Sequence, residues 1–223
     1  MPKVPRNDQE INEFKDRILD VTAAIIREDG FNNLSMRKIG ACMNMAAASL
    51  YYYFTSKDEI YLAIRMRAGN ILHEKLSVAY ASSSDLQTKA LNMIRAYVEF
   101  GLHQSHYYEV MFNSTAPKYS DYKGTALEKA AADERESSLL SLAVLRQCVG
   151  DFAEAGYDVP EDIKTVQLTL WSQLHGIVSM HNNNLLKNVG YSQEEMGCSL
   201  EETVNKVADL FFVMIMSFIE KTL

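Results

Sequence analysis

Helix breakers are scarce in this chain, and that scarcity constrains its fold more than any other feature. The sequence has only four prolines and ten glycines in 223 residues, so long stretches remain in which helices can form. Within them apolar residues recur at spacings of three and four, the period of one helix face. The first such set is Ile11, Phe14, Ile18, Val21 and Ile25. No alternating strand pattern and no internal repeat is found, so we predict an all-α protein.

Capping residues and breaks predict where the helices begin and end. Near the N-terminus we expect helices at residues 8–29, 36–43, 46–52 and 57–80, with Gly30 ending the first, Ser35 capping the second, and Ser56 and Glu59 forming a capping box before the fourth. Further helices are expected at residues 85–103, 106–112, 125–155, 160–181 and 200–221, with Pro160 opening the fourth of these and Ser199 and Glu202 capping the last. Residues 182–197 are expected to form a loop with room for one turn of helix.

The acidic residues are unevenly distributed. The formal net charge is -7, which argues against a protein that coats nucleic acid without specificity. Residues 30–57 nevertheless contain no Asp or Glu, although they include Arg37, Lys38 and Lys57. One segment of an acidic protein is therefore locally positive, and it can present a basic surface to a partner.

Several classes of protein are disfavoured by the sequence. Cys42, Cys148 and Cys198 are odd in number and far apart, so neither a disulfide framework nor a zinc site is indicated. The start lacks the apolar region of a secretory signal, and the longest apolar run, residues 210–216, is too short to cross a bilayer. We expect a cytoplasmic protein without a membrane partner.

The common enzymatic motifs do not occur in this chain. The sequence contains no G-x-S-x-G, no P-loop and no G-x-G-x-x-G. His103 and His106 lie three residues apart, with only Glu99 and Glu109 nearby as further metal ligands. We expect no catalytic residue, no metal site and no cofactor.

The succession helix, tight turn, helix across residues 35–53 is typical of a helix-turn-helix, whose second helix lies in the DNA major groove. Small residues at the start of that helix let the backbone approach base edges, while Leu50 and Phe54 anchor its other face in the core. Tyrosine hydroxyls can donate to phosphate oxygens, and Lys57 adds a cation at a helix start. The predicted DNA-contacting residues are Ser35, Arg37, Ala46, Ala47, Ser49, Tyr51, Tyr53 and Lys57.

Residues 18–60, and above all the stretch LYYYFTSKDE at 50–59, resemble the N-terminal domain of the tetracycline-repressor (TetR) family of transcription regulators. The resemblance implies a homodimer whose C-terminal helices bind a small molecule and whose last two helices dimerise. Trp171, His175 and Gly176 look like the tryptophan-histidine-glycine signature of one C-terminal subclass. We expect a DNA-binding domain at residues 1–56, joined by a long helix to a ligand-binding and dimerisation domain at residues 57–223.

The chain departs from the family pattern at the turn. Met43, Asn44, Met45 and Ala46 stand where the family usually has Ala-Gly-Val and then Ser. Asn44 can replace the turn glycine because asparagine tolerates left-handed conformations. With small side chains leading the recognition helix, sequence readout is expected to depend on Ser49, Arg37, thymine methyl contacts and DNA shape.

Aromatic and soft side chains on the later helices suit a mostly apolar ligand pocket with a few polar groups. The predicted ligand-binding residues are Tyr97, Phe100, Tyr107, Met111, Phe112, Trp171, Leu174 and His175. Residues of these types at helical spacing also form ordinary cores. The effector is expected to be a small, largely apolar molecule.

The final helix is apolar nearly all round between residues 210 and 219. It is either a central core helix or, as we expect, part of a dimer interface beside the helix at 160–181. The predicted function is a ligand-responsive repressor that binds a near-palindromic operator in double-stranded DNA as a homodimer. The alternatives are a helical small-molecule binding protein that has lost specific DNA binding, and an oligomeric interaction scaffold.

Overall fold

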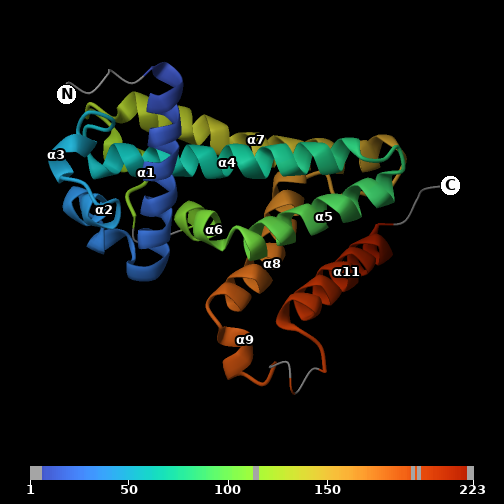
Figure 1. Cartoon of the computed structure of the whole chain (residues 1–223). Coiled ribbons are helices and arrows are strands. Elements are labelled where there is room, and N and C mark those ends of the chain that lie inside the picture. The colour runs from blue at the N-terminus through green and yellow to red at the C-terminus, as the bar shows by residue number, and fades with distance from the viewer. Residues whose placement is uncertain (1–6, 113–115, 192–193, 195–196, 220–223) are drawn as a thin grey trace. The chain divides into compact units, whose positions relative to one another are not determined.

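The computed structural model describes residues 7–112, 116–191, 194 and 197–219. Its regular elements in this part of the chain are all helices (Figure 1), so the predicted all-α class is confirmed. The contacts divide the chain into two compact units, one formed by residues 1–69 and 106–137 and the other by residues 70–105 and 138–223. Among the described residues no helix combines the length and the apolar character needed to cross a bilayer.

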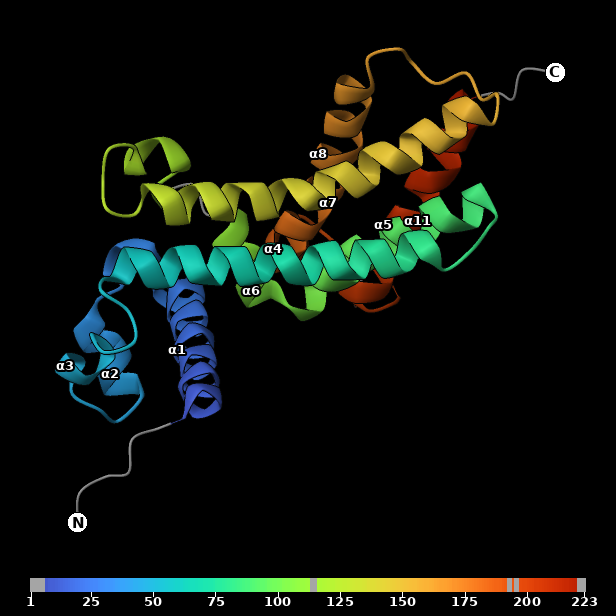
Figure 2. The same cartoon turned by 90° about the horizontal axis from the view of Figure 1, so that it is seen from above.

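The first unit contains the N-terminal helices. Its complete helices are α1 (Asp8–Asp29), η1 (Phe31–Asn33), α2 (Met36–Cys42), α3 (Ala47–Leu50) and η2 (Tyr119–Tyr122). It also contains nearly all of α6 (Ser105–Phe112), with the first parts of α4 (Lys57–Ala81) and α7 (Glu128–Glu154). In Figures 1 and 2, α2 and α3 lie together at the end of α4 where that helix begins, and α1 runs beside them. This is the arrangement of a helix-turn-helix domain.

Local signals explain the boundaries of these helices. Asn7 accepts a hydrogen bond from the amide of Glu10, whose carboxylate accepts one from the amide of Asn7, so that the two residues form a capping box for α1. Gly30 ends this helix, and the Ser35 hydroxyl caps α2 by accepting from the amide of Lys38. The predicted end of the first helix and start of the second are therefore confirmed. Fully buried side chains from four helices form the core of the unit: Ile18, Ile39, Leu50, Ile60 and Ile64.

The second unit contains the later helices. It comprises the remainder of α4 and α7, together with α5 (Leu86–His103), α8 (Ile163–Asn182), α9 (Leu185–Asn188) and α11 (Leu200–Phe218). Helix α5 packs against both α8 and α11, and α8 packs against α11. Phe100, Val178 and Val204, one from each of these helices, are fully buried.

Three predicted helix starts and ends are wrong. Helix α8 begins at Ile163 rather than at Pro160, because the Asp162 carboxylate caps it by accepting from the amide of Thr165. Helix α7 begins at Glu128, since a turn closed by Thr125 and Tyr122 precedes it. The predicted helix over residues 46–52 is a single turn, followed by a turn at residues 51–53.

The two predicted capping boxes have different outcomes. The box of Ser199 and Glu202 is present at the start of α11. At α4 the Ser56 hydroxyl accepts from the amide of Glu59, but the Glu59 carboxylate binds the amide and hydroxyl of Thr55 instead. The predicted end of the last helix at residue 221 lies outside the described residues. The domain division at residue 56 stays a prediction.

Candidate nucleic-acid interface

A tight turn between α2 and α3 sets the position of the recognition helix. Asn44 has a positive φ of 55°, so it takes the left-handed conformation that the sequence predicted for it. The amide of Met45 donates to the carbonyl oxygen of Gly40 over 2.9 Å. A side-chain carbon at Gly40 would lie only 2.8 Å from the Met45 oxygen. The turn can therefore lie this close to α2 only because residue 40 has no side chain.

The sequence prediction did not include Gly40. A glycine in the middle of a short amphipathic helix lowers helix propensity, and such a residue often marks a close approach of another backbone. That signal was present in the sequence.

The start of α3 presents small residues to solvent. Ala46 caps the helix in an extended conformation, and Ala48 and Ser49 are exposed, while Ala47 is half-buried. Leu50, in the same turn of helix, is fully buried, and Phe54 is buried as well. The prediction that these two residues belong to the core is therefore confirmed. The exposed face of α3 is thus free of bulky side chains, and its backbone can come close to a partner.

The three consecutive tyrosines have different surroundings. Tyr51 is 55% exposed and Tyr52 is 73% exposed. The Tyr53 ring is half-buried, with its centre 4.8 Å from that of Phe14 on α1. Tyr52, which the sequence prediction did not include, is therefore the most accessible of the three phenols. Helical spacing could not find it, because α3 ends before these residues.

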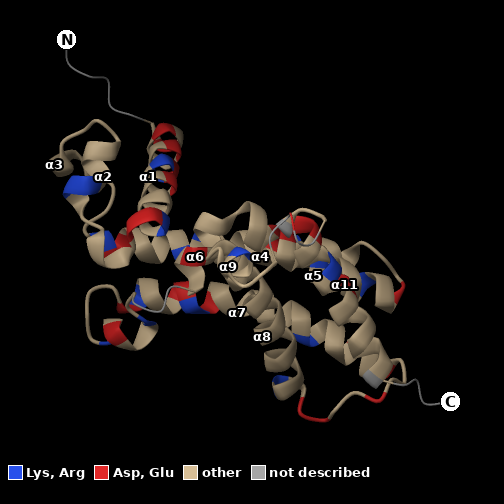
Figure 3. Ribbon diagram, turned by 90° about the horizontal axis from the view of Figure 1, so that it is seen from below, with Lys and Arg blue, Asp and Glu red and all other residues tan. Residues whose placement is uncertain are grey.

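The basic residues of this region also differ in their contacts. Arg37 is exposed, whereas Lys38 forms an ion pair of 2.7 Å with Asp29. The Lys57 ammonium lies 4.8 Å from the centre of the Phe31 ring and reaches the Leu34 carbonyl oxygen at 3.5 Å. Figure 3 shows α2 and α3 without acidic residues, in contrast to α1. Because Asp29 neutralises Lys38, the positive charge that this surface offers to phosphate groups comes from Arg37 and Lys57.

The predicted ligand-binding residues are divided between the two units. In the second unit the Trp171 indole donates to the Tyr97 hydroxyl over 3.2 Å, and Phe100 and Leu174 are buried. Burial also lowers the pKa of His175, so its ring is neutral at pH 7. This group combines apolar surface with neutral polar groups.

The other three residues lie on α6, in the first unit. The Tyr107 hydroxyl donates to the Asp20 carboxylate, and Met111 and Phe112 are half-buried. None of the eight predicted residues lines the open groove of about 580 Å³ between α4 and α5 in the second unit. Their contact with a ligand stays a prediction.

Comparison with known proteins identifies the family. Residues 18–64 match the model of the bacterial regulatory proteins of the tetR family, and residues 90–203 match the tetracyclin repressor-like C-terminal domain. The chain belongs to the TetR family. It is thus a helix-turn-helix DNA-binding transcriptional regulator. Its assignment to the tryptophan-histidine-glycine subclass stays a prediction.

Individual TetR-like proteins are similar over most of their length. An uncharacterized HTH-type transcriptional regulator of Xanthobacter autotrophicus, from the dhlA 5' region, is 22% identical over 184 aligned residues, in a match that covers 74% of this chain and 91% of that protein. The TetR family regulator PfmR of Thermus thermophilus superposes with a TM-score of 0.68 at 17% identity, covering 94% of this chain and 97% of the other. The ketosteroid regulator KstR2 of Mycobacterium tuberculosis gives 0.67 at 17% identity, covering 95% and 97%. At these identities the structures support the shared fold.

Proposed function

We propose that this TetR-family protein is a repressor that binds a near-palindromic operator as a homodimer and is released by a small molecule. The observation that carries the proposal is the solvent-exposed surface of α2 and α3, where Arg37, Ala48 and Ser49 are accessible and acidic residues are missing from residues 30–57. Such a surface allows a close approach of the backbone to base edges and of cations to phosphates. In a dimer, two of these helices would enter major grooves about 34 to 36 Å apart.

The effector we propose is largely apolar, with a neutral hydrogen-bonding group. Phe100 and Leu174 supply buried apolar surface, while the uncharged His175 and the bonded pair of Trp171 and Tyr97 supply polar atoms without formal charge. Burying an unpaired charge among such groups is costly, so a neutral ligand is favoured. The ligand can release the protein from DNA only by its higher affinity for the conformation that does not fit the operator.

The test is a binding titration in which the protein is added to fluorescently labelled DNA from beside its own coding sequence. Binding is measured by fluorescence anisotropy at several salt concentrations. Wild type should bind this fragment more tightly than unrelated DNA of equal length. Replacing Lys57 by glutamine should weaken binding and lower the slope of log affinity against log salt by about 1, because one phosphate contact is lost.

Lys164→Gln is the matched control, since Lys164 is an exposed lysine on α8 of the second unit. Its salt slope should equal that of wild type. Equal slopes for Lys57→Gln and wild type would refute a phosphate contact at Lys57. Equal affinity of wild type for both DNA fragments would refute the operator at this place and favour a small-molecule binding protein without specific DNA binding.

A further inference from the structure

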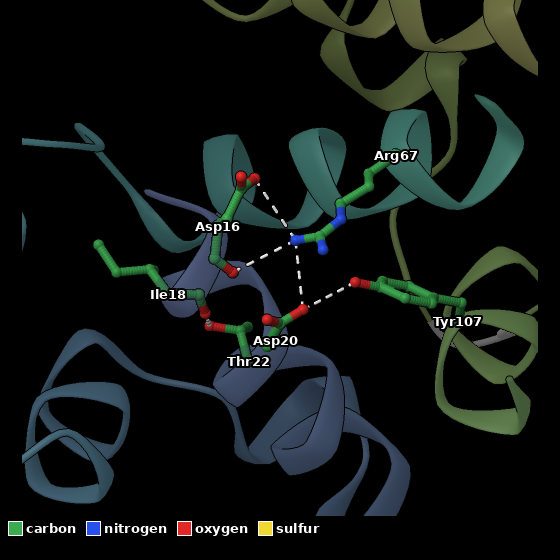
Figure 4. Close-up of polar contacts among 6 residues, drawn as sticks. All are labelled: Asp16, Ile18, Asp20, Thr22, Arg67 and Tyr107. Carbon is green, nitrogen blue, oxygen red and sulfur yellow. Dashed lines mark hydrogen bonds and ion pairs between the residues drawn. The ribbon is translucent and has the colours of Figure 1, made fainter. Parts of the chain in front are cut away.

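Three helices of the first unit meet at one carboxylate. The Tyr107 hydroxyl of α6 donates to Oδ1 of Asp20 on α1 over 2.8 Å, and the Arg67 guanidinium of α4 lies 3.2 Å from the same oxygen. Arg67 also donates to the main-chain oxygen of Asp16 at 3.3 Å and lies 5.5 Å from the centre of the Tyr107 ring. Figure 4 shows the three side chains converging between the helices. We call Asp20, Arg67 and Tyr107 the α1–α6 link.

The hydrogen bond of Tyr107 is the shortest polar contact within the α1–α6 link. Tyr107 is only 5% exposed, and its hydroxyl makes a short, part-buried bond to the charged Asp20 carboxylate, so losing this bond removes a favourable contact between α6 and α1. Burial, together with the Asp20 carboxylate, raises the pKa of this phenol, which therefore remains a neutral donor to a charged acceptor. The ion pairs of Arg67 with Asp16 and Asp20 are about half exposed on the acidic side, so they are screened and contribute less.

Helix α1 carries Asp20 and also contacts the helix-turn-helix. The helix packs against η1 and α2, and its side chains Ile18 and Ala23 are fully buried. Next to Asp20, the Thr22 hydroxyl donates to the main-chain oxygen of Ile18 (Figure 4), so the turn that carries the carboxylate is held by its own polar contact. Close-packed helices resist deformation. A displacement of α6 that separates Tyr107 from Asp20 would therefore remove a contact that fixes α1, and α1 is the helix that packs against α2.

We propose that Asp20, Arg67 and Tyr107 are positioning residues for operator binding, which hold α1, and with it α2 and α3, in the orientation that fits DNA. The proposal rests on the proposed DNA-binding function.

The test uses the full-length variants Tyr107→Phe, Asp20→Ala and the double variant. Two quantities are measured: hydrogen–deuterium exchange of the α1 amides, and affinity for the DNA fragment beside the protein's own coding sequence, well below the melting temperature. Each single variant should speed exchange in α1 and weaken DNA binding about 3- to 10-fold, the effect of losing one ordinary hydrogen bond, because the half-exposed Asp20 carboxylate is screened by solvent. The double variant should be no weaker than the single variants, because all three lack the same bond.

Glu13→Ala and Tyr191→Phe are the controls. Glu13 is an exposed acid of α1 that contacts Gln9, and Tyr191 is exposed in the second unit. Removing an acid from α1 reduces repulsion of phosphates, so Glu13→Ala should bind DNA as tightly as wild type or more tightly. Asp20→Ala removes the same charge and should nevertheless bind more weakly. This opposite sign separates positioning from electrostatics, and Tyr191→Phe should match wild type in both measurements.

Each outcome supports or contradicts the proposal that the α1–α6 link positions α1 for DNA binding. Unchanged α1 exchange in Tyr107→Phe overturns it, whatever the DNA result. Faster exchange with wild-type affinity also overturns it, because the bond then only stabilises the fold. Should wild type itself not bind the fragment, the proposed operator function fails, while the exchange measurement still reports whether Tyr107 restrains α1.

Discussion

Burial distinguishes the three cysteines of this regulator at the scale of single residues. Cys42 is exposed, Cys198 is half-buried, and Cys148 is buried in α7. Removal from water disfavours the thiolate, and the nearby Asp151 carboxylate acts in the same direction, which together raise the pKa of Cys148 to about 11. Since the thiolate is the nucleophile, Cys148 should be the unreactive thiol.

We expect a thiol reagent at pH 8 to modify two cysteines of the native protein quickly and the third only after denaturation. At this pH a thiol of pKa 11 has about 0.1% thiolate, and its burial excludes the reagent as well. The measurement is the number of fast-reacting thiols in a colorimetric assay. Cys148→Ser should keep both fast thiols, whereas the double variant Cys42→Ser and Cys198→Ser should keep none. Three fast thiols in wild type would contradict the burial of Cys148.

At the scale of elements, the packing of α2 against the α2–α3 turn depends on Gly40. We expect Gly40→Ala to lower the free energy of unfolding by about 1–3 kcal/mol, because the added carbon would meet a backbone oxygen that cannot move without opening the turn. Gly150→Ala is the matched control, since Gly150 lies in α7 with nothing within 4 Å of an added carbon. It should raise that free energy by about 0.5–1 kcal/mol. Urea unfolding measures both, and a stabilising Gly40→Ala would contradict the tight turn.

Sequence signals predicted the elements that have strong local caps. Gly30 and Ser35 mark the end of α1 and the start of α2 correctly because each bonds within its own turn. The start of α8 was missed because Pro160 and Asp162 are competing start signals two residues apart, and only the observed cap selects Asp162. Residue patterns therefore give element existence more reliably than element ends.

Residue type predicted the left-handed turn at Asn44, and helical spacing predicted the buried face of the recognition helix. The burial of Leu50 follows from its spacing to Phe54, but the exposure of Tyr52 does not, because the chain leaves the helix before it. The bond between Asp20 and Tyr107 joins residues 87 positions apart, and no local pattern contains such a pair. Contacts of this kind are set by tertiary packing.

At the scale of the whole molecule, one face of α11 is apolar and accessible. Its exposed apolar side chains recur at spacings of three and four: Val207, Leu210, Val213 and Met214. The other face is buried through Val204, Ala208 and Phe211, so α11 already has its partners within the chain on that side. Leu168 of α8 is exposed as well. Apolar side chains left exposed on two helices that pack together are typical of a subunit interface, and they support the proposed homodimer.

We expect Val213→Glu to convert the protein to monomer at micromolar concentration, as measured by sedimentation velocity. A two-fold axis places the same residue on both subunits, so one substitution introduces two carboxylates into one interface. Each would have to be buried without a partner, at a cost of several kcal/mol. Val78→Glu is the control, because Val78 is 66% exposed and Val213 61%, yet Val78 lies on α4. It should remain dimeric. If Val213→Glu remained dimeric, the interface would not lie on α11. If wild type were monomeric, the proposal of a near-palindromic operator would fail, because such an operator needs two subunits to contact its two half-sites.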